Sequence, residues 1–432
     1  MTFSPRSFAR RFHGGIILFL LLLLSAAVRM IGIDTPFLRP HEANNAIYSV
    51  AARNLLRYGV TGCRYSNFLG TPGAPPLPQD YYRNHFPTLS IFVAAAMRLG
   101  GIDDVAPRLV AILFSLFGVA LIFLVTLRRF SLIPALAAGL GAGLAPGAVH
   151  YGRIANFEVV ILPFGLLYLD LLFRPDSSNP RIASRRTALL LLLPVVATSI
   201  DPPGALFLAG AAVFHRNRRE ILPGFVGACA ILAGFAFVYS STDPGALHQI
   251  LHSIQMRTGI GTAVLHSAVP TILFRHIPVF FTPLAVAIAL FGAGILLSNP
   301  TLRSHRRFFG ALFVWGFSYL LLFPQAALIH EYWVFYLLPA IAFGCAAFLT
   351  TPRPRALVAA VLAAFLVESH LVFHRFHDGP KGSYTEEFAI VSAIRSSPTR
   401  SPLYRSPFSP RTLHVRWYTD ARVVERKSKG EN

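Results

Sequence analysis

The chain has 432 residues, of which 54% are hydrophobic and only 13% are charged, and its mean hydropathy is +0.55. That composition excludes a water-soluble globular protein of this length. The formal net charge of +20 comes mostly from arginines between apolar runs and in the C-terminal tail, so they indicate membrane orientation and do not favour nucleic-acid binding. Cys63, Cys229 and Cys345 are far apart and predict neither a disulfide framework nor a zinc motif.

The first apolar run, residues 14–33, follows Arg6, Arg10 and Arg11. At 1.5 Å per residue it is long enough to cross a bilayer core of about 30 Å. Because the run is long and no small-residue cleavage site follows, the pattern favours an uncleaved signal anchor with a cytoplasmic N-terminus over a signal peptide.

A polar loop is predicted over residues 34–104, and it begins with a helical pattern over residues 39–59. Ala46 and Val50 recur at helical spacing while Arg53 and Arg57 fall on the other face, so we expect an amphipathic helix on the membrane surface. His41 and Glu42 lie at its N-terminal end, where an acid could simply favour the helix dipole. Residues 88–99 are apolar but too short to span, which indicates an interfacial or re-entrant helix.

Ten further apolar runs predict eleven spans with the first: 105–127, 132–150, 155–173, 187–200, 203–215, 221–239, 269–297, 308–323, 333–349 and 356–373. Arginines crowd the loops on one side, whereas the short loops on the other side hold only Arg153 and Arg257. The positive-inside rule then places the N-terminus inside and the C-terminus outside. The basic loops on both sides of residues 187–215 require two short helices there, turning at Asp201-Pro202-Pro203. The tail, 374–432, could hold a small outside domain or nothing ordered.

This topology gathers many polar residues on the predicted outside face: His41, Glu42, Tyr82, His85, His150, Arg153, Glu158, Asp201, His248, Arg257, His330, Glu331 and Tyr332. Charges near membrane depth are costly, so such residues are functional candidates. Any one of them could instead be a helix cap or a surface group, but a set that shares one face favours a site.

Four local patterns give a family resemblance. Residues 39–43 look like an acidic pair in a first outside loop, and residues 84–87 look like a His-Pro-Pro segment. Residues 151–158 resemble a Ser-Arg-x-Ala-x-x-Asp/Glu pattern, and residues 330–333 with Pro339 resemble a late His-x-Tyr-Tyr segment and its downstream proline. In this order the patterns resemble the GT-C glycosyltransferases of the protein O-mannosyltransferase and aminoarabinose-transferase type, over roughly residues 15–350.

The resemblance implies an all-α polytopic membrane protein, with a GT-C-like bundle of about eleven transmembrane helices over residues 1–373 and a large first extracytoplasmic loop. It implies an inverting transfer of a sugar from a polyprenyl-phosphate donor to an acceptor hydroxyl of a glycan, lipid or protein. The arginine-rich, lysine-poor composition favours a bacterial inner membrane. The expected partners are membrane lipid and the lipid-linked sugar, with no nucleic acid. No tightly bound cofactor is expected, and the need for a divalent metal stays open.

The chemistry needs a base for the acceptor hydroxyl and a cation for the leaving phosphate. Where the family carries Asp before Glu, this chain has His41 before Glu42, so either residue could be the base; we predict Glu42, assisted by His41. Arg153, Arg257 and Arg275 are the candidate cations, although the last two could snorkel to lipid headgroups. The predicted substrate-binding residues are Tyr82, His85, Arg153, Glu158, Arg257, His330 and Tyr332.

The spacing of His41, Glu42 and His85 gives no positive sign of a metal site. Two other classes of protein stay open at this stage. A transporter or flippase could use the outside residues as a vestibule, although we find no internal repeat of the kind transporters show. An inactive GT-C homologue acting as a partner subunit is the other, because His41 departs from the family pattern.

Overall fold

The computed structural model describes residues 5–37, 39, 41–70, 80–175, 179–243, 245–259, 264–351, 354–377, 403–404, 417 and 423–424. The predicted tail, 374–432, therefore lies largely outside the described residues, and its division from the rest of the chain stays a prediction.

Helices make up nearly all of the described chain. They are α1 (Pro5–Met30), α2 (Ala43–Gly62), α3 (Thr88–Gly100), α4 (Val105–Arg129), α5 (Leu132–Leu144), α6 (Pro146–Tyr151), α7 (Phe157–Leu172), α8 (Pro180–Ile200), α9 (Phe207–Phe214), α10 (Leu222–Thr242), α11 (Ala246–Thr258), α12 (Val264–Thr271), α13 (Ile277–Phe281), α14 (Pro283–Ser298), α15 (Arg303–Leu322), α16 (Pro324–Ile329), α17 (Leu338–Phe348) and α18 (Arg355–His377). Short 3-10 turns include η2 (Pro202–Ala205), η5 (Pro300–Leu302) and η6 (Glu331–Leu337), and η4 (Ile272–His276) is a π-turn. Two-residue strands pair as β1 (Asn67–Phe68) with β2 (Tyr81–Tyr82), antiparallel, and β3 (Leu403–Tyr404) with β4 (Val423–Val424), parallel.

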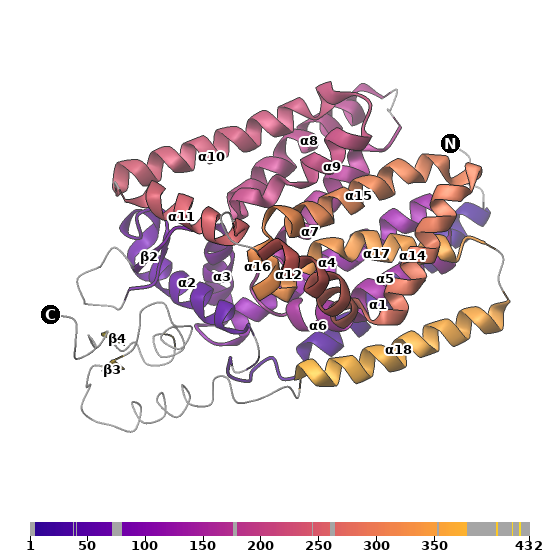
Figure 1. The fold of residues 1–432 in the computed structure, drawn as a ribbon, viewed down its shortest axis with the longest axis horizontal. Coiled ribbons are helices and arrows are strands. Elements are labelled where there is room, and N and C mark those ends of the chain that lie inside the picture. Colours follow the sequence, from indigo (N-terminus) through magenta and orange to yellow (C-terminus); the bar gives the residue numbers. More distant parts are fainter. Residues whose placement is uncertain are drawn as a thin grey trace.

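The long helices lie side by side, and α2, α3 and α11 gather at one end of the bundle (Figure 1). Small residues let helices approach closely within it. A Cβ atom on Gly292 of α14 would lie 1.8 Å from the carbonyl oxygen of Gly344 on α17, so only glycine fits at that crossing. Close backbone approach of this kind is how helices associate in a bilayer, where apolar side chains gain nothing by leaving lipid.

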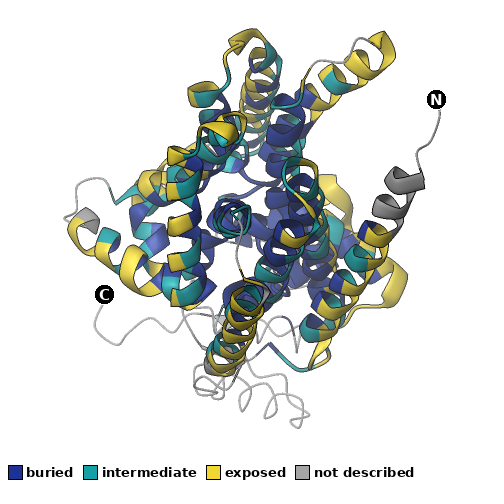
Figure 2. Ribbon diagram, turned by 90° about the vertical axis from the view of Figure 1, so that its right-hand side faces the viewer, coloured by how far each residue is buried: buried dark blue, intermediate teal, exposed yellow. Residues whose placement is uncertain are grey.

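Exposed residues lie along the outside of the bundle (Figure 2), and many of them are large and apolar, as expected of a lipid-facing surface. Phe274 is 81% exposed, for example, and Phe237 and Phe291 are also exposed. Six helices are long and apolar enough to cross a membrane, and a bent pair could add a seventh. The prediction of an all-α polytopic membrane protein is therefore confirmed, while the figure of eleven spans stays a prediction.

Two predicted runs are interrupted in the structure. Run 132–150 divides into α5 and α6 at Ala145, directly before Pro146. Run 269–297 bends by 105° between the helical segment that ends at Phe281 and α14. Thr282, at that bend, has φ +77° and precedes Pro283, whose ring disfavours a helical conformation at the residue before it. Hydropathy is unchanged through both breaks, so it could not reveal them.

The predicted break at Asp201-Pro202-Pro203 is confirmed, because α8 ends at Ile200 and α9 begins only after η2. The expectation for the surface helix needs a correction. Most of the first three turns of α2 are buried, and Arg53, predicted on the outward face, is buried too. Arg57, on the same predicted face, is exposed.

Candidate functional site

The candidate site lies at the end of the bundle that α2, α3 and α11 define (Figure 1). The loop after α1, the segment before α3, the α6–α7 junction, the end of α8, the end of α11 and the α16–η6 junction all contribute to it. It brings together seven of the nine predicted site residues: His41, Tyr82, His85, Glu158, Arg257, His330 and Tyr332. Glu42 and Arg153 are buried beside it in contacts that hold the loops.

His85 links two helices that are distant in the sequence. Its Nδ1 lies 2.6 Å from Oδ1 of Asp201, and its Nε2 lies 2.6 Å from Nη2 of Arg257. A guanidinium can only donate, so Nε2 accepts and Nδ1 carries the proton that is donated to Asp201. The ring also stacks on Phe157, with 3.9 Å between centroids. Burial, with Arg257 nearby, lowers the pKa of His85 to about 4, so the ring is neutral at physiological pH.

Arg257 faces other predicted residues as well. It donates a hydrogen bond to the hydroxyl of Tyr82 and interacts electrostatically with Glu158. Glu158, in the first turn of α7, is only 4% exposed, and its Oε2 has no hydrogen-bond partner among the described residues. A buried carboxylate oxygen without a donor is costly, and a ligand hydroxyl is one group that could supply the donor.

His41 stands at the centre of a second cluster. Its ring centroid lies 5.2 Å from that of Tyr332 and 5.8 Å from those of Tyr151 and His330. Its backbone is left-handed, with φ +62°, a conformation that histidine tolerates better than most residues do. Burial lowers the pKa of His41, and the nearby Glu331 partly opposes that shift. His41 is thus a neutral imidazole able to accept a proton.

Glu331 is hydrogen-bonded to one residue of the cluster and lies near another. The hydroxyl of Tyr151 donates to its Oε1, and Nδ1 of His276 lies 3.7 Å from its Oε2. His276 comes from the π-turn η4, and its Nε2 lies 3.1 Å from the carbonyl oxygen of Leu328, to which it donates. π-turns frequently mark functional sites.

His330 and Tyr332 connect the two clusters. Their rings stack with 5.0 Å between centroids, and Nδ1 of His330 has no hydrogen-bond partner within the described part of the chain. Burial, then His41 and Arg257, lower the pKa of His330 to about 4. Tyr332 shares a hydrogen bond with Asn44 and interacts electrostatically with Glu158. His330 therefore links His41 to Arg257 through ring contact and electrostatic interaction.

Glu42 has a different environment from its neighbour His41. Its Oε1 accepts from Nη2 of Arg108 at 2.8 Å, and its Oε2 accepts from the backbone N–H of Arg39 at 2.9 Å. The side chains of Glu42 and Arg108 are both buried. Burial alone would raise the pKa of Glu42, but Arg108 and Arg39 outweigh it and lower the pKa. The base role predicted for Glu42 stays a prediction, and these contacts make its carboxylate a weak proton acceptor.

Arg153 is likewise occupied by the protein itself. Its Nη1 and Nη2 donate to the carbonyl oxygens of Ile31 and Gly32 at 2.5 and 2.7 Å, which holds the chain that follows α1. Burial, with Arg39 and Arg108 nearby, lowers its pKa to about 10. Arg275 is exposed. Among the three candidate cations, Arg257 is therefore the one that belongs to the polar cluster.

Some functional partners were not assigned a role from the sequence. Asp201 and Glu331 belong to the predicted outside set, but nothing in the sequence pairs them with His85 or Tyr151. His276 lies inside an apolar run, and only the π-turn brings it into the cluster. Within the described ranges, no group of three or more His, Cys, Asp or Glu side chains is placed to hold a metal ion.

An all-helical membrane bundle with its polar cluster at one end, assembled from the segment between α1 and α4 and from later helix ends, is the arrangement expected of the GT-C class of fold. Solved structures agree. The chain is similar to ArnT from Cupriavidus metallidurans bound to undecaprenyl phosphate, with TM-score 0.68, 14% identity and coverage of 95% of this chain and 86% of that one. The apo state of that ArnT gives a TM-score of 0.64 with the same identity and coverage.

The Archaeoglobus fulgidus oligosaccharyltransferase, in complex with Zn and sulfate, is a more distant likeness. Its TM-score is 0.58 at 12% identity, and the match covers 95% of this chain but 62% of that one. No protein-family model matches the chain, and the comparison with curated protein sequences gives no match. At these identities the likeness establishes the GT-C fold, and the activity must be argued from the site.

Proposed function

We propose that the chain is an inverting membrane glycosyltransferase that moves a sugar from a polyprenyl-phosphate donor to an acceptor hydroxyl. The observation that carries the proposal is the convergence of Arg257, Glu158 and His41 at one end of a GT-C bundle. A cation for the leaving phosphate and a neutral imidazole for the acceptor's proton are the groups that this transfer needs. The buried carboxyl group of Glu158, with one oxygen unpartnered among the described residues, adds a group that can bind a sugar hydroxyl. We place this end at the extracytoplasmic face of a bacterial inner membrane, as the charge distribution predicts.

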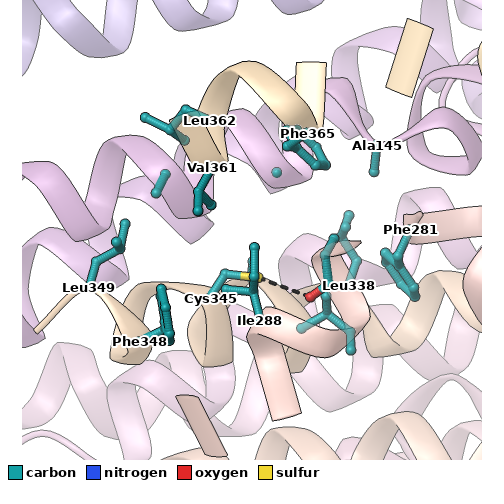
Figure 3. Close-up of a pocket in the computed structure, with 15 residues that line it drawn as sticks. Ala145, Phe281, Ile288, Leu338, Cys345, Phe348, Leu349, Val361, Leu362 and Phe365 are labelled. Carbon is teal, nitrogen blue, oxygen red and sulfur yellow. Dashed lines mark hydrogen bonds between the residues drawn. The ribbon is translucent and has the colours of Figure 1, made fainter. Parts of the chain in front are cut away.

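An apolar groove in the bundle supports a lipid-linked donor. Residues of α5, α14, α17 and α18 line it, including Ile288, Cys345 and Leu362 (Figure 3). At one end of the groove lies Phe281. Phe281 contacts Phe280, with 4.7 Å between centroids, and Phe280 stacks on Tyr151 of the His41 cluster. An isoprenoid chain in this groove would have its phosphate near the polar cluster, and the ArnT neighbour was solved with undecaprenyl phosphate.

In the proposed reaction the base removes the acceptor's hydroxyl proton, and the oxygen attacks the anomeric carbon from the face opposite the phosphate. The bond from the anomeric carbon to the phosphate oxygen breaks, and polyprenyl phosphate leaves as an anion. Arg257 stabilises that growing charge, so no proton donor is needed. His85, which Asp201 positions, holds the guanidinium. Glu158, Tyr82, His330 and Tyr332 orient the sugar and phosphate.

The environments of the two predicted base residues favour His41 for the proton transfer. Glu42 has both oxygens engaged by Arg39 and Arg108. His41 has a neutral ring beside Glu331, which would stabilise the imidazolium formed after proton uptake. In this assignment Glu42 and Arg108 fix the loop that presents His41.

The test is turnover by purified full-length protein in nanodiscs with a panel of radiolabelled polyprenyl-phosphate sugars. We expect release of polyprenyl phosphate, and a loss of about 10²–10³-fold in Arg257→Gln. Glutamine can still donate to His85, and the exposed Arg275→Gln serves as the matched control that keeps full turnover. Full turnover by Arg257→Gln would contradict the assigned cation. Transport of a lipid-linked solute without any turnover would instead establish the transporter class.

A further inference from the structure

A second charged cluster lies at the opposite end of the bundle from the candidate site. Two helices connect the two ends. Helix α4 carries Arg108, the partner of Glu42, near its start and Arg128 in its last turn. Helix α7 begins with Glu158 and carries Asp170 near its end. With 25 residues at 1.5 Å each, α4 is long enough to cross a bilayer core, so the second cluster belongs to the other membrane face.

Three guanidinium groups converge there on one carboxylate. Asp170 is completely buried, and its Oδ1 accepts from Nη1 of Arg129 at 2.5 Å. Its Oδ2 accepts from Arg128 and from Nε of Arg174, the latter at 3.0 Å. Within the described ranges, no second carboxylate forms an ion pair with any of the three arginines. Among these described groups, one negative charge thus faces three positive charges, a local excess of two.

The three arginines are not equivalent. Arg129 is mostly buried and lies over the ring of Phe308, with its guanidinium carbon 3.8 Å from the centroid. Arg128 and Arg174 are 42% and 38% exposed, so their remaining N–H groups can reach a ligand. Asp170 and Arg129 therefore fix the other two guanidinium groups side by side at the surface. Guanidinium groups held in this way match the oxygens of a phosphate.

The neighbouring surface indicates where the phosphate comes from. Leu113 and Phe117 are exposed on α4, and the same helical face continues through the half-buried Leu124 to Arg128. The spacings of four, seven and four residues keep these side chains in one stripe along the helix. The acyl chain of a lipid can lie on this stripe while its headgroup reaches the arginines. A free phosphate would gain nothing from the apolar stripe.

We propose that Arg128 and Arg174, braced by Asp170 and Arg129, bind the phosphate of an anionic phospholipid headgroup at the membrane face opposite the candidate site. The shared chemistry is a phosphate anion, and the two possible sources, a lipid or free phosphate, are separated by experiment. This proposal does not depend on the glycosyltransferase assignment.

The experiment measures the melting temperature of the full-length protein in neutral detergent during titration with phosphatidylglycerol, or with phosphatidylcholine of the same acyl chains. We expect phosphatidylglycerol alone to raise the melting temperature by a few degrees. The double variant R128Q/R174Q should lose more than half of that shift, while Arg129 still pairs with Asp170. R181Q/R185Q, which changes two exposed arginines of α8, is the matched control and should keep the whole shift.

Two results would overturn the proposal. One is a full phosphatidylglycerol shift in R128Q/R174Q. The other is an equal shift with millimolar inorganic phosphate, which would assign the cluster to a free anion. If the double variant does not fold, the single variants R128Q and R174Q decide the question, because each keeps Asp170 paired with the two remaining arginines. Each should lose part of the phosphatidylglycerol shift, whereas a full shift in both would show that the arginines serve only to neutralise Asp170.

Discussion

His41 and Glu42 are adjacent in the sequence, but their side chains have different tasks in the structure. Glu42 is buried in an ion pair with Arg108, so Glu42→Gln leaves a buried guanidinium unpaired. Removing one partner of such a pair costs about 3–5 kcal/mol of folding free energy. His41→Asn should leave folding nearly unchanged, because asparagine tolerates the positive φ, while turnover falls by about 10²–10⁴-fold with the loss of the base.

Thermal unfolding together with turnover per folded molecule separates the two roles. A well-folded but inactive Glu42→Gln beside an active His41→Asn would return the base to Glu42, as the sequence alone predicts. Arg108→Gln is the control for the loss of the ion pair, since it should reproduce the stability loss of Glu42→Gln.

The neutral state of His85 predicts a pH dependence of stability. Its pKa is about 4 in the folded protein and 6.5 when unperturbed, so between these values the unfolded chain binds more protons than the folded one. Stability therefore rises with pH through that window and is lost as the pH falls from about 6.5 towards 4. His85 alone can contribute up to about 1.4 kcal/mol per pH unit there.

Melting temperatures of wild type and His85→Asn between pH 4.5 and 7.5 test this. The variant should show a shallower decline, because asparagine does not titrate and still offers an amide donor to Asp201. His330 shares the same low pKa, so some acid sensitivity should remain. Parallel curves for the two proteins would mean that His85 does not titrate in this window.

The contacts of His85 show which features of the site the sequence can predict and which it cannot. Positive-inside reasoning places His85, Asp201 and Arg257 on one face, and the structure brings all three together. Asp201 is 116 residues from His85 and Arg257 is 172 residues from it, and nothing local encodes which partner each ring nitrogen receives. The sequence also could not predict that Arg153 is buried against the residues that follow α1. Its position in a motif does not reveal whether an arginine binds a ligand or a backbone carbonyl.

At the scale of elements, a residue from the tail holds the segment between α1 and α4 in place. The indole Nε1 of Trp417 donates to Oδ1 of Asp104 at 2.6 Å, and its carbonyl oxygen accepts from Nη1 of Arg53 at 2.9 Å. Its ring stacks on Phe37 at 6.3 Å between centroids, and Arg108 lies over the ring of Phe37. A chain of contacts thus runs from the tail to the Glu42–Arg108 pair.

We expect Trp417→Ala to lower stability by about 3 kcal/mol, as for other buried tryptophans. Trp417→Phe is the matched variant: it keeps ring packing and loses one hydrogen bond, at a cost of about 1 kcal/mol. Thermal unfolding and limited proteolysis of full-length protein measure both effects. If Trp417→Ala and the wild type have the same melting temperature, the tail does not stabilise the loop.

The sequence located most helices well but could not give their paths. Pro202 and Pro203 carry an explicit signal, and the predicted break is present. At Thr282 the proline signal is also in the sequence, yet an apolar run on both sides hid the bend, because hydropathy measures composition and not direction. The burial of Arg53 depends on Trp417, a residue 364 positions away, which no local pattern can anticipate.

At the scale of the whole molecule, the bundle separates two kinds of charge. One end holds the polar cluster around His85, with neutral imidazoles, the Glu42–Arg108 ion pair and the carboxyl group of Glu158. The other end holds the arginines around Asp170 and, near it in the sequence, the ion pair of Arg186 with Glu220 at 2.7 Å. Composition and loop charge predict that charged groups gather at the two ends of the bundle. Charged side chains are costly in the membrane core, so they are confined to the ends of the apolar helices.

The charge division predicts which end faces the cytoplasm, and accessibility to a membrane-impermeant maleimide tests it. Ser241 is exposed at the end of α10, two residues before Asp243, whose carboxylate lies 2.5 Å from Nη1 of Arg83 at the site end. Thr301 is exposed in η5, next to the arginines at the start of α15. Single cysteines at these positions, on a background with the exposed Cys229 changed to alanine, report opposite ends.

We expect Ser241→Cys to be labelled in intact cells and Thr301→Cys only after permeabilisation, because the positive-inside rule keeps the arginine-rich end in the cytoplasm. The background protein without an added cysteine is the control for reaction at Cys63 and Cys345. Labelling in the reverse order would put the polar cluster on the cytoplasmic side and would contradict a sugar transfer at the extracytoplasmic face. The proposed activity and the proposed orientation therefore depend on the same physical fact, the uneven distribution of arginine along an apolar chain.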